Sequence, residues 1–307
     1  MSPLPPDAAR RPCPVCQAET RLPWRTKGTL HLVRCTACRM VFADPLPPES
    51  EAAHYDQLGR PFYLSADKLE GDFASVRFTR ELRLLRRFAS EGSVLDVGCS
   101  TGAFLHQVRT RWPDAYQVTG IDVSTAALDH ARSHGIEVVA DSLLTHDFGA
   151  RRFDVVTFWA VLEHLPDPLS FLERARHWLR PEGVCLVLVP NLAALGVRLL
   201  GTRYRYILPQ HVNYFEAGTL ERLTRQAGLS PIARGGSHFN PIVLWQDWRR
   251  GSDELVPDRE RAALLRRTTR WKQSLIATPA RLGLSLAEKL LAAMGCADNL
   301  WLAARRP

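Results

Sequence analysis

Four cysteines near the start of the chain have the spacing of a metal site. They form two pairs, C-P-V-C at residues 13–16 and C-T-A-C at residues 35–38. Two thiolates on each of two short turns can surround a tetrahedral ion, which is the arrangement of a zinc ribbon. Four cysteine ligands leave no open coordination position, so zinc here would fold the module and would not catalyse. The predicted ligands are Cys13, Cys16, Cys35 and Cys38.

A second stretch, residues 94–105, has the residue types of a nucleotide-binding turn. It reads V-L-D-V-G-C-S-T-G-A-F-L, in which an apolar run precedes a turn between Gly98 and Gly102 and helical spacing follows. Such a turn brings backbone N–H groups close to a ligand. Asp96 precedes the turn, and the next expected strand ends in Asp122, where a carboxylate can accept both hydroxyls of a ribose. The alternative is a structural strand–turn–helix that binds nothing.

This combination resembles motif I and the following acidic motif of class I S-adenosylmethionine-dependent methyltransferases. The resemblance extends from about residue 74 to the C-terminus, with Ser100 where the family most often has glycine. It implies an acid near the adenine amino group after the third strand, and backbone facing the methionine moiety after the fourth. The cofactor contacts that the resemblance implies are Asp96, Gly98, Cys99, Gly102, Asp122, Val123, Asp141, Ser142, Phe158 and Trp159.

Two histidines are candidates for removing a proton from the methyl acceptor. His164 follows the fourth strand, next to Glu163, which we expect to orient its neighbours rather than to catalyse. His211 follows the fifth strand in the stretch H-x-x-Y-F, where class I enzymes often bind their acceptor. His211 is the sharper candidate for the general base. Either histidine could instead make structural hydrogen bonds only.

The H-x-x-Y-F stretch and the four-cysteine module resemble bacterial methyltransferases associated with sugar and polysaccharide biosynthesis. Deoxysugar C-methyltransferases among them have a Glu-His pair where this chain has Gln210 and His211, so the acid is missing here. We therefore expect O- or N-methylation of a sugar, a glycan precursor or a secondary metabolite.

Two other functions remain open on the sequence alone. A ribosomal RNA guanine methyltransferase also joins a zinc module to this fold, which would make the ribbon an RNA-binding device. That module ends in a Cys-x₃-His pair, whereas this one ends in Cys35-x₂-Cys38, and the Asn/Asp-Pro-Pro-aromatic signature of base N-methyltransferases is absent. The chain could also be a non-catalytic docking protein, against which the intact glycine turn argues.

The elements that must position these residues alternate between strand and helix, which predicts an α/β fold with a parallel doubly wound sheet. We expect a Rossmann-like, seven-stranded methyltransferase sheet with a small N-terminal zinc ribbon and a helical insertion before the last strand. Strands are expected at 29–34 and 40–43 in the ribbon, and at 94–97, 116–121, 136–140, 153–158, 184–189, 229–233 and 299–304 in the sheet. Helices before the sheet are expected at 51–58 and 71–89, and Tyr55 or Tyr63 could contact the cofactor. The expected divisions are a flexible tail 1–10, the ribbon 11–44, linker and covering helices 45–90, the methyltransferase core 91–241, the insertion 242–296 and the last strand with a tail 297–307.

Composition is that of an ordinary globular protein, with 307 residues, 46% of them hydrophobic and 23% charged. The net charge of +8 invites a nucleic-acid partner, but the basic residues are spread along the chain and are nearly all Arg. No apolar run is long enough to span a bilayer and no N-terminal signal is present, so we expect a cytoplasmic protein. A membrane-surface role for the helices of residues 259–294 is the less favoured alternative.

Overall fold

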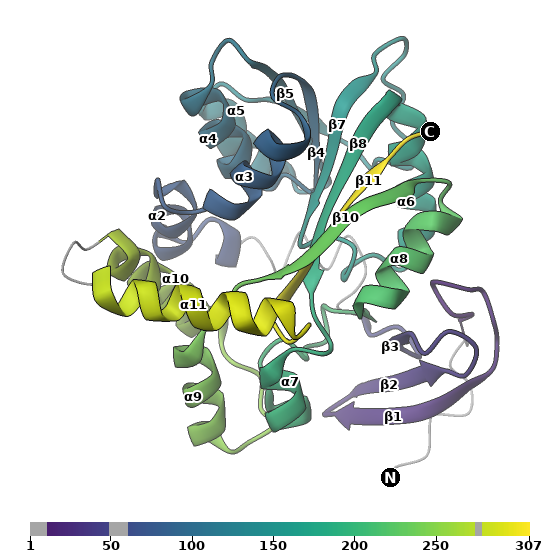
Figure 1. Cartoon of the computed structure of the whole chain (residues 1–307), viewed down its shortest axis with the longest axis vertical. Coiled ribbons are helices and arrows are strands. Elements are labelled where there is room, and N and C mark those ends of the chain that lie inside the picture. Colours follow the sequence, from purple (N-terminus) through teal and green to yellow (C-terminus); the bar gives the residue numbers. More distant parts are fainter. Residues whose placement is uncertain (1–10, 49–60, 274–277) are drawn as a thin grey trace.

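The computed structural model describes residues 11–48, 61–273 and 278–307, which form two sheets with flanking helices (Figure 1). The expected tail at residues 1–10 and the expected helix at 51–58, with Tyr55, lie outside the described residues.

The larger sheet has seven strands in the order β10-β11-β8-β7-β4-β5-β6. Their bounds are β4 Gly92–Val97, β5 Tyr116–Asp122, β6 Glu137–Ala140, β7 Phe153–Trp159, β8 Leu179–Pro190, β10 Ser230–Ser237 and β11 Asn299–Arg305. Strands β4 to β8 pair in parallel, and β11 runs antiparallel between β8 and β10. The predicted doubly wound, seven-stranded sheet is therefore confirmed.

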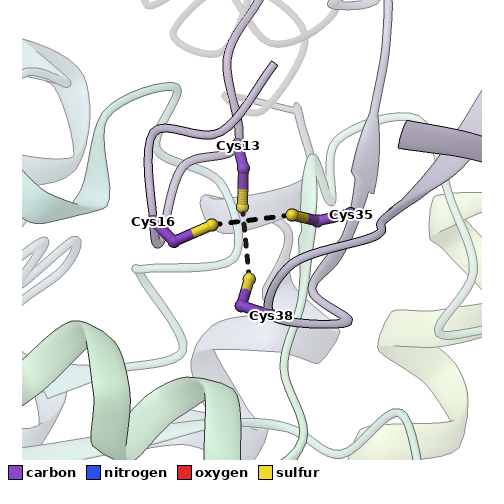
Figure 2. Close-up of side chains that lie close together, drawn as sticks. All are labelled: Cys13, Cys16, Cys35 and Cys38. Carbon is purple, nitrogen blue, oxygen red and sulfur yellow. Dashed lines mark hydrogen bonds between the residues drawn. The ribbon is translucent and has the colours of Figure 1, made fainter. Parts of the chain in front are cut away.

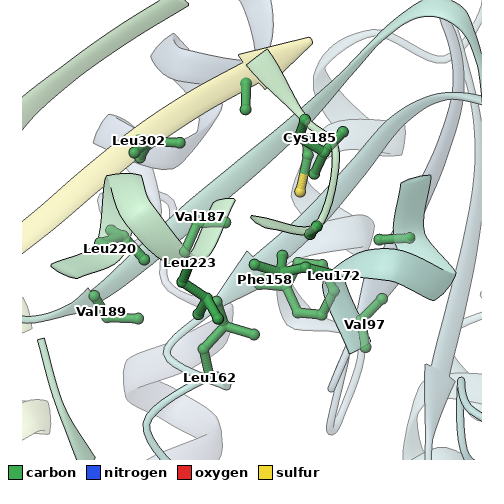
Figure 3. Close-up of a cluster of buried hydrophobic side chains, with 14 of the residues drawn as sticks. Val97, Phe158, Leu162, Leu172, Cys185, Val187, Val189, Leu220, Leu223 and Leu302 are labelled. Carbon is green, nitrogen blue, oxygen red and sulfur yellow. The ribbon is translucent and has the colours of Figure 1, made fainter. Parts of the chain in front are cut away.

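Helices cover both faces of this sheet. They are α3 Thr79–Phe88, α4 Ala103–Arg111, α5 Thr125–Ser133, α6 Pro168–Trp178 and α8 Ala217–Gln226. On one face, Leu172 of α6 and Leu223 of α8 pack with Phe158 and Val187 of the sheet (Figure 3). On the other face, α3, α4 and α5 pack on a second buried apolar cluster. Both faces of the parallel strands are thus buried, as their nearly continuous apolar runs require.

The helix predicted at residues 71–89 is wrong, because this stretch contains parts of two shorter helices. They are α2 Ala66–Phe73 and α3 Thr79–Phe88, and between them the backbone of Ala74 is extended and that of Phe78 is left-handed, with φ 55°. The side chain of Gln107 donates to the carbonyl of Ala74 at 2.9 Å. This bond satisfies a backbone carbonyl at the end of α2. The apolar spacing continues across the break, which is why the periodicity suggested one helix.

The smaller sheet is built mostly from the cysteine module, in the order β1-β2-β3-β9. Its strands are β1 Arg21–Lys27, β2 Leu30–Cys35, β3 Val41–Ala43 and β9 Asn213–Tyr214. The two predicted ribbon strands match β2 and β3, whereas β1 was not predicted. Strand β9 comes from the other end of the methyltransferase core and pairs antiparallel with β3, with Phe42 opposite Asn213. The module is therefore joined to the core by a shared sheet.

Among the residues that the structure describes, three helices stand between β10 and β11, in agreement with the predicted helical insertion. They are α9 Pro241–Arg250, α10 Asp258–Gln273 and α11 Thr278–Ala293. Helix α10 packs on α2, where Arg266 lies 2.8 Å from Asp67 and Arg270 lies 2.6 Å from Glu70. A short unpredicted helix, α7 Leu195–Leu200, follows β8. Within the described residues, no helix combines the length and the apolar character needed to cross a membrane.

Candidate active site and cysteine centre

The glycine turn lies at the carboxyl edge of the parallel strands, directly after β4. Gly98 and Gly102 have positive φ values of 70° and 71°. A Cβ on Gly98 would lie 2.7 Å from Cγ2 of Val161, and a Cβ on Gly102 would lie 2.9 Å from Cβ of Ala131. Both positions therefore need glycine for conformation and for space. The contact with Val161 also brings the turn against the segment that follows β7.

Asp122, at the end of β5, is tied to this turn. Its Oδ2 accepts a hydrogen bond from the backbone N–H of Ser100 at 2.8 Å, and its Oδ1 accepts one from Ser124 at 2.9 Å. A carboxylate oxygen can accept more than one hydrogen bond, so the geometry is compatible with additional ribose hydroxyls. The neighbouring Val123 is 40% exposed, which leaves an apolar surface beside the acid.

Asp96 and Cys99 are buried, so their side chains support the turn from the side of the protein core. Oδ1 of Asp96 accepts a hydrogen bond from Oγ1 of Thr157 at 2.5 Å. Burial, together with the negative charge of Asp122, raises the pKa of Asp96 to about 7. The sulfur of Cys99 packs on Gly120, where an added Cβ would lie only 2.5 Å away. Any contact of Cys99 with a ligand would come from its backbone.

Two other predicted cofactor residues, Asp141 and Ser142, directly follow β6, the strand that pairs with β5. Asp141 donates its N–H to the carbonyl of Asp122 at 3.2 Å, and its Oδ1 accepts from the N–H of Ser142 at 2.7 Å. Hydrogen bonds to its side chain, chiefly from Thr145, lower the pKa of Asp141. The predicted acids after β5 and β6 are therefore neighbours.

Phe158 and Trp159, the last two residues of β7, differ in how deeply their side chains are buried. The side chain of Phe158 is fully buried in the core. Trp159 is half-buried, and its ring meets that of Phe104 edge-to-face with centroids 5.4 Å apart. Its indole Nε1 is buried and has no hydrogen-bond partner among the described residues.

The two predicted catalytic histidines lie side by side although they come from different segments. The rings of His164 and His211 are 4.8 Å apart and nearly perpendicular. The carboxylate of Glu163 joins them, and one ligand atom of each of the three side chains lies within 4.8 Å of the others. We call Glu163, His164 and His211 the Glu-His-His cluster. No local sequence signal predicted it, because residue spacing does not report a contact between distant segments.

Burial controls the charge of this cluster. It lowers the pKa of His164 to about 4 and lowers that of His211 well below its ordinary value, with the charge of the other histidine as a further cause for His211. It also raises the pKa of Glu163 to about 8. Each histidine Nδ1 donates to a carbonyl oxygen, that of Gln210 for His164 at 2.8 Å and that of Tyr206 for His211 at 2.9 Å. The Nε2 atoms of both rings therefore carry the lone pairs.

The segment that carries His211 is held from two sides. On one side, the backbone N–H groups of Val212 and Asn213 donate to the carbonyl of Glu163 at 2.8 and 3.1 Å. On the other side lies the cysteine module, where the N–H of Ala43 donates to the carbonyl of Val212 at 2.9 Å. The guanidinium of Arg11 donates to that same carbonyl at 3.2 Å. The module thus contributes to the position of a candidate catalytic residue.

The four predicted metal ligands converge, with their sulfur atoms directed at one another (Figure 2). The Sγ atoms of Cys13 and Cys38 are 3.5 Å apart, as are those of Cys16 and Cys35. Tetrahedral zinc with Zn–S bonds of about 2.3 Å requires sulfur separations of roughly 3.8 Å. Burial raises the pKa of the Cys13 thiol to about 11, so a bound cation would be needed to hold it as a thiolate. The residues therefore fit a zinc ion.

Comparison with known proteins identifies the class that this fold and site define. Residues 73–233 match the family described as a methyltransferase domain, and the chain belongs to that family. It is 36% identical over 168 residues to a ubiquinone biosynthesis O-methyltransferase of Haemophilus ducreyi, which covers 49% of this chain and 70% of that protein. It is 31% identical over 195 residues to a protein of the same name from Bordetella bronchiseptica, with coverage of 57% and 79%.

Solved structures share the fold. A methyltransferase of Thermotoga maritima superposes with a TM-score of 0.52 at 14% identity, covering 84% of this chain and 99% of that chain. A phosphoethanolamine N-methyltransferase of Haemonchus contortus gives a TM-score of 0.52 at 20% identity, covering 84% of this chain and 59% of that chain. The protein is a class I S-adenosylmethionine-dependent methyltransferase acting on small molecules, as the sequence predicted. The cysteine module and the helical insertion lie outside residues 73–233, the part of the chain that matches the methyltransferase domain family.

Proposed function

We propose that this enzyme transfers the methyl group of S-adenosylmethionine to an oxygen atom of a small hydroxylated acceptor. The main observation that supports this proposal is that the glycine turn and the Glu-His-His cluster lie at the same edge of the sheet. Val161, the neighbour of Gly98, precedes Glu163 by two positions in the chain. A donor on the turn and an acceptor beside the cluster would then be close enough for an in-line displacement.

The cofactor would lie along the carboxyl ends of β4, β5, β6 and β7. In this proposal Asp122 binds the ribose, Asp141 and Ser142 lie near the adenine, and the backbone at Phe158 and Trp159 faces the methionine moiety. The turn contributes backbone groups at Gly98, Cys99 and Gly102, with Asp96 beneath it and Val123 beside the adenosine. When bound, S-adenosylmethionine supplies an electrophilic methyl group. The residues of this chain bind it and exclude water.

A hydroxyl becomes an effective nucleophile when its proton is removed. His211 is suited to this role because its lowered pKa keeps it neutral near pH 7 and its Nε2 carries a lone pair. The acid that is absent at Gln210 has a counterpart in Glu163, which belongs to the same cluster. We propose that His211, together with His164 and Glu163, handles the acceptor proton.

The names of the relatives, rather than the site alone, support the proposed acceptor class. Proteins named ubiquinone biosynthesis O-methyltransferase support an oxygen as the methylated atom and an intermediate of quinone biosynthesis as the acceptor. The expected sugar or glycan acceptor has no counterpart in these names. We therefore propose a hydroxylated precursor of a quinone, with the sugar as the alternative that the experiment separates.

The cysteine module is proposed to hold structural zinc at Cys13, Cys16, Cys35 and Cys38. The convergence of the four sulfur atoms supports this assignment. Because the module shares a sheet with β9, its proposed role is to support the acceptor side of the site rather than to dock a separate partner.

The test is transfer of labelled methyl groups from S-adenosylmethionine to host extract, followed by separation into quinone precursors, sugar nucleotides, lipids, protein and RNA. Label in the quinone-precursor fraction is expected. Label in sugar nucleotides would identify a sugar, and not a quinone precursor, as the acceptor. RNase-sensitive label would overturn the small-molecule proposal. His211→Ala is expected to lower turnover by roughly 10²–10⁴-fold with unchanged cofactor affinity. The matched control is His177→Ala, which alters a histidine of α6 outside the cluster.

A further inference from the structure

Three basic side chains from separate parts of the chain lie close to one another. Lys68 belongs to α2, Arg77 to the break between α2 and α3, and Arg261 to the start of α10, which packs beside α2 (Figure 1). Lys68 and Arg261 lie over the same ring, that of Phe62, with Nζ 5.6 Å and Cζ 5.1 Å from its centroid. We call Lys68, Arg77 and Arg261 the basic cluster.

Acidic side chains neutralise this cluster only in part. Among the described residues, Asp72 is the one carboxylate that forms ion pairs with Lys68 and Arg77, and it is shared between them. Arg261 pairs at 2.9 Å with Asp258 of its own helix, whose side chain is 50% exposed, so solvent weakens that pair. Burial lowers the pKa of Lys68, Asp72 opposes this shift, and the charges of Arg77 and Arg261 add to it. The basic cluster therefore has a surplus of positive charge.

One end of the basic cluster lies beside the proposed catalytic histidines. Burial lowers the pKa of His164 and of His211, and the nearby charge of Arg261 is a further cause at both positions. Burial raises the pKa of Tyr206, whose carbonyl orients His211, and the charges of Arg261 and Arg77 oppose that rise. The positive charge is therefore directed at the place where we propose that the acceptor binds.

The other end of the cluster lies beside the proposed donor. The guanidinium of Arg77 lies 4.6 Å from the ring centroid of Phe78. That ring meets Phe104, in the first turn of α4, with centroids 5.8 Å apart, and Phe104 in turn meets Trp159 at the end of β7. The basic cluster thus extends from the side of the glycine turn to the Glu-His-His cluster.

An arginine next to two histidines does not strengthen them as bases, because it disfavours their protonated form. It does favour negative charge on a molecule that the histidines contact. We propose that the methyl acceptor carries an acidic group in addition to its hydroxyl, a carboxylate or a phosphate, and that Arg261 and Lys68 bind this group. A guanidinium presents a planar fork that matches either anion, and an ammonium adds a point charge. This inference rests on the proposed function and narrows its acceptor class.

The test compares molecules that differ only by the acidic group. The 307-residue protein, saturated with S-adenosylhomocysteine, is titrated in a calorimeter with 3,4-dihydroxybenzoate and with catechol, and separately with glucose 1-phosphate and with glucose. The first pair reports a carboxylate and the second a phosphate. We expect the anionic member of one pair to bind at least about tenfold more tightly than its neutral partner. Equal affinity within both pairs, or no binding of either anion, overturns the proposal.

Variants of the basic cluster show which side chains bind the anion. Arg261→Gln should weaken binding of the preferred anion by roughly tenfold, as expected for the loss of a hydrogen bond between charged groups. Lys68→Met, which leaves Asp72 paired with Arg77, should have a similar effect. Arg267→Gln is the matched control, because Arg267 is an exposed arginine of the same helix, and it should keep the affinities of the wild type. The thermal melt and the affinity for S-adenosylhomocysteine report whether each variant folds.

The outcomes separate this inference from the proposed function. An equal loss of affinity for the anionic and the neutral member in Arg261→Gln would assign Arg261 to the hydroxyl and overturn the acidic group. Methyl transfer to catechol and to 3,4-dihydroxybenzoate with equal kcat/KM would also overturn it and leave the proposed function standing. Anion binding that depends on Arg261, without methyl transfer to any acceptor, would support the inference and count against the proposed function only.

Discussion

The guanidinium of Arg11 donates to the side-chain oxygen of Asn213 at 2.9 Å, linking the cysteine module to the residue two positions beyond His211. Asn213 also donates from Nδ2 to the carbonyls of Leu162 and Leu165 at 2.9 and 2.7 Å. One buried amide therefore connects the module, the acceptor segment and the segment that carries Glu163.

Replacing that amide should loosen all three parts. Asn213→Ala removes three hydrogen bonds at a residue that is 1% exposed, and we expect a loss of about 3 kcal/mol in the free energy of unfolding. Urea unfolding measures it. Thr36→Ala, which removes a hydroxyl from an exposed pair in the same module, should change stability by less than about 0.5 kcal/mol. Equal effects of the two substitutions would contradict the linking role of Asn213.

The glycine turn predicts a second pair of substitutions. Gly98→Ala introduces a Cβ at 2.7 Å from Val161 with φ at 70°, and we expect at least about a tenfold loss of S-adenosylmethionine affinity, measured by calorimetry. Gly149→Ala has a similar positive φ of 61° but meets no atom within 4 Å. It should cost about 1 kcal/mol of stability and leave cofactor affinity unchanged. Unchanged affinity in Gly98→Ala would remove the turn from the cofactor site.

Two aspartates of adjacent strands should give pH dependences of opposite sign. Burial raises the pKa of Asp96 from 3.8 to about 7, so its contribution to stability is present below about pH 4 and is lost as the pH rises through 7. In ligand-free protein, the free energy of unfolding of Asp96→Asn should therefore rise relative to that of the wild type as the pH increases from 4 to 7. The relative gain should be at most about 4 kcal/mol.

Asp154 provides the comparison. Its carboxylate accepts hydrogen bonds from the backbone and hydroxyl of Ser93, and together with Arg180 these lower its pKa despite partial burial. Its stabilising contribution is present above the unfolded pKa near 3.9 and is lost as the pH falls through the lower folded value. Asp154→Asn should therefore be least damaging in acid. Parallel curves for the two variants in urea unfolding at pH 3 to 7 would refute the assigned shifts.

A buried ion pair sets the position of the carbonyl that orients His211. Arg205 lies 2.6 Å from Asp247 of α9, with side chains 7% and 1% exposed, and it directly precedes Tyr206. Asp247→Asn should lower stability by about 3 kcal/mol because it leaves a buried guanidinium uncompensated. It should also reduce methyl transfer while S-adenosylmethionine affinity is kept, since the proposed cofactor residues lie at the ends of β4, β5, β6 and β7 and not on α9.

The control for that pair is the exposed bridge between Arg234 and Glu221 at 3.0 Å. Glu221→Gln is expected to change stability by less than about 1 kcal/mol, and methyl transfer not at all. If Asp247→Asn behaved like this control in chemical unfolding and in the labelled-methyl assay, the insertion would have no part in positioning the acceptor segment.

Local patterns in the sequence were sufficient for most of the large sheet. Strand β5 was expected to end at Asp122 and β11 to begin at Asn299, because apolar runs bounded by turn residues have the same appearance in any context. The Gly98 turn was recognisable for a similar reason, since its strained conformation requires small residues.

Contacts between distant segments could not be read in this way. The pairing of Phe42 with Asn213 and the approach of Glu163 to His211 depend on how the chain returns to the same sheet edge, which residue spacing does not encode. The break before Phe78 was hidden because apolar residues continue on both sides of it. Strand β8 begins at Leu179, earlier than the expected start at residue 184, because Pro181 and Gly183 interrupt the apolar run by which a strand is recognised.

The pairing of β3 with β9 has a consequence for solubility. Strand β9 is two residues long and is followed by the fully buried Phe215, and its backbone is matched on one side by the cysteine module. A catalytic fragment cut to residues 61–307 would leave that edge unpaired next to apolar side chains, which is the arrangement that recruits other chains into aggregates. The module therefore also acts as a cover against self-association.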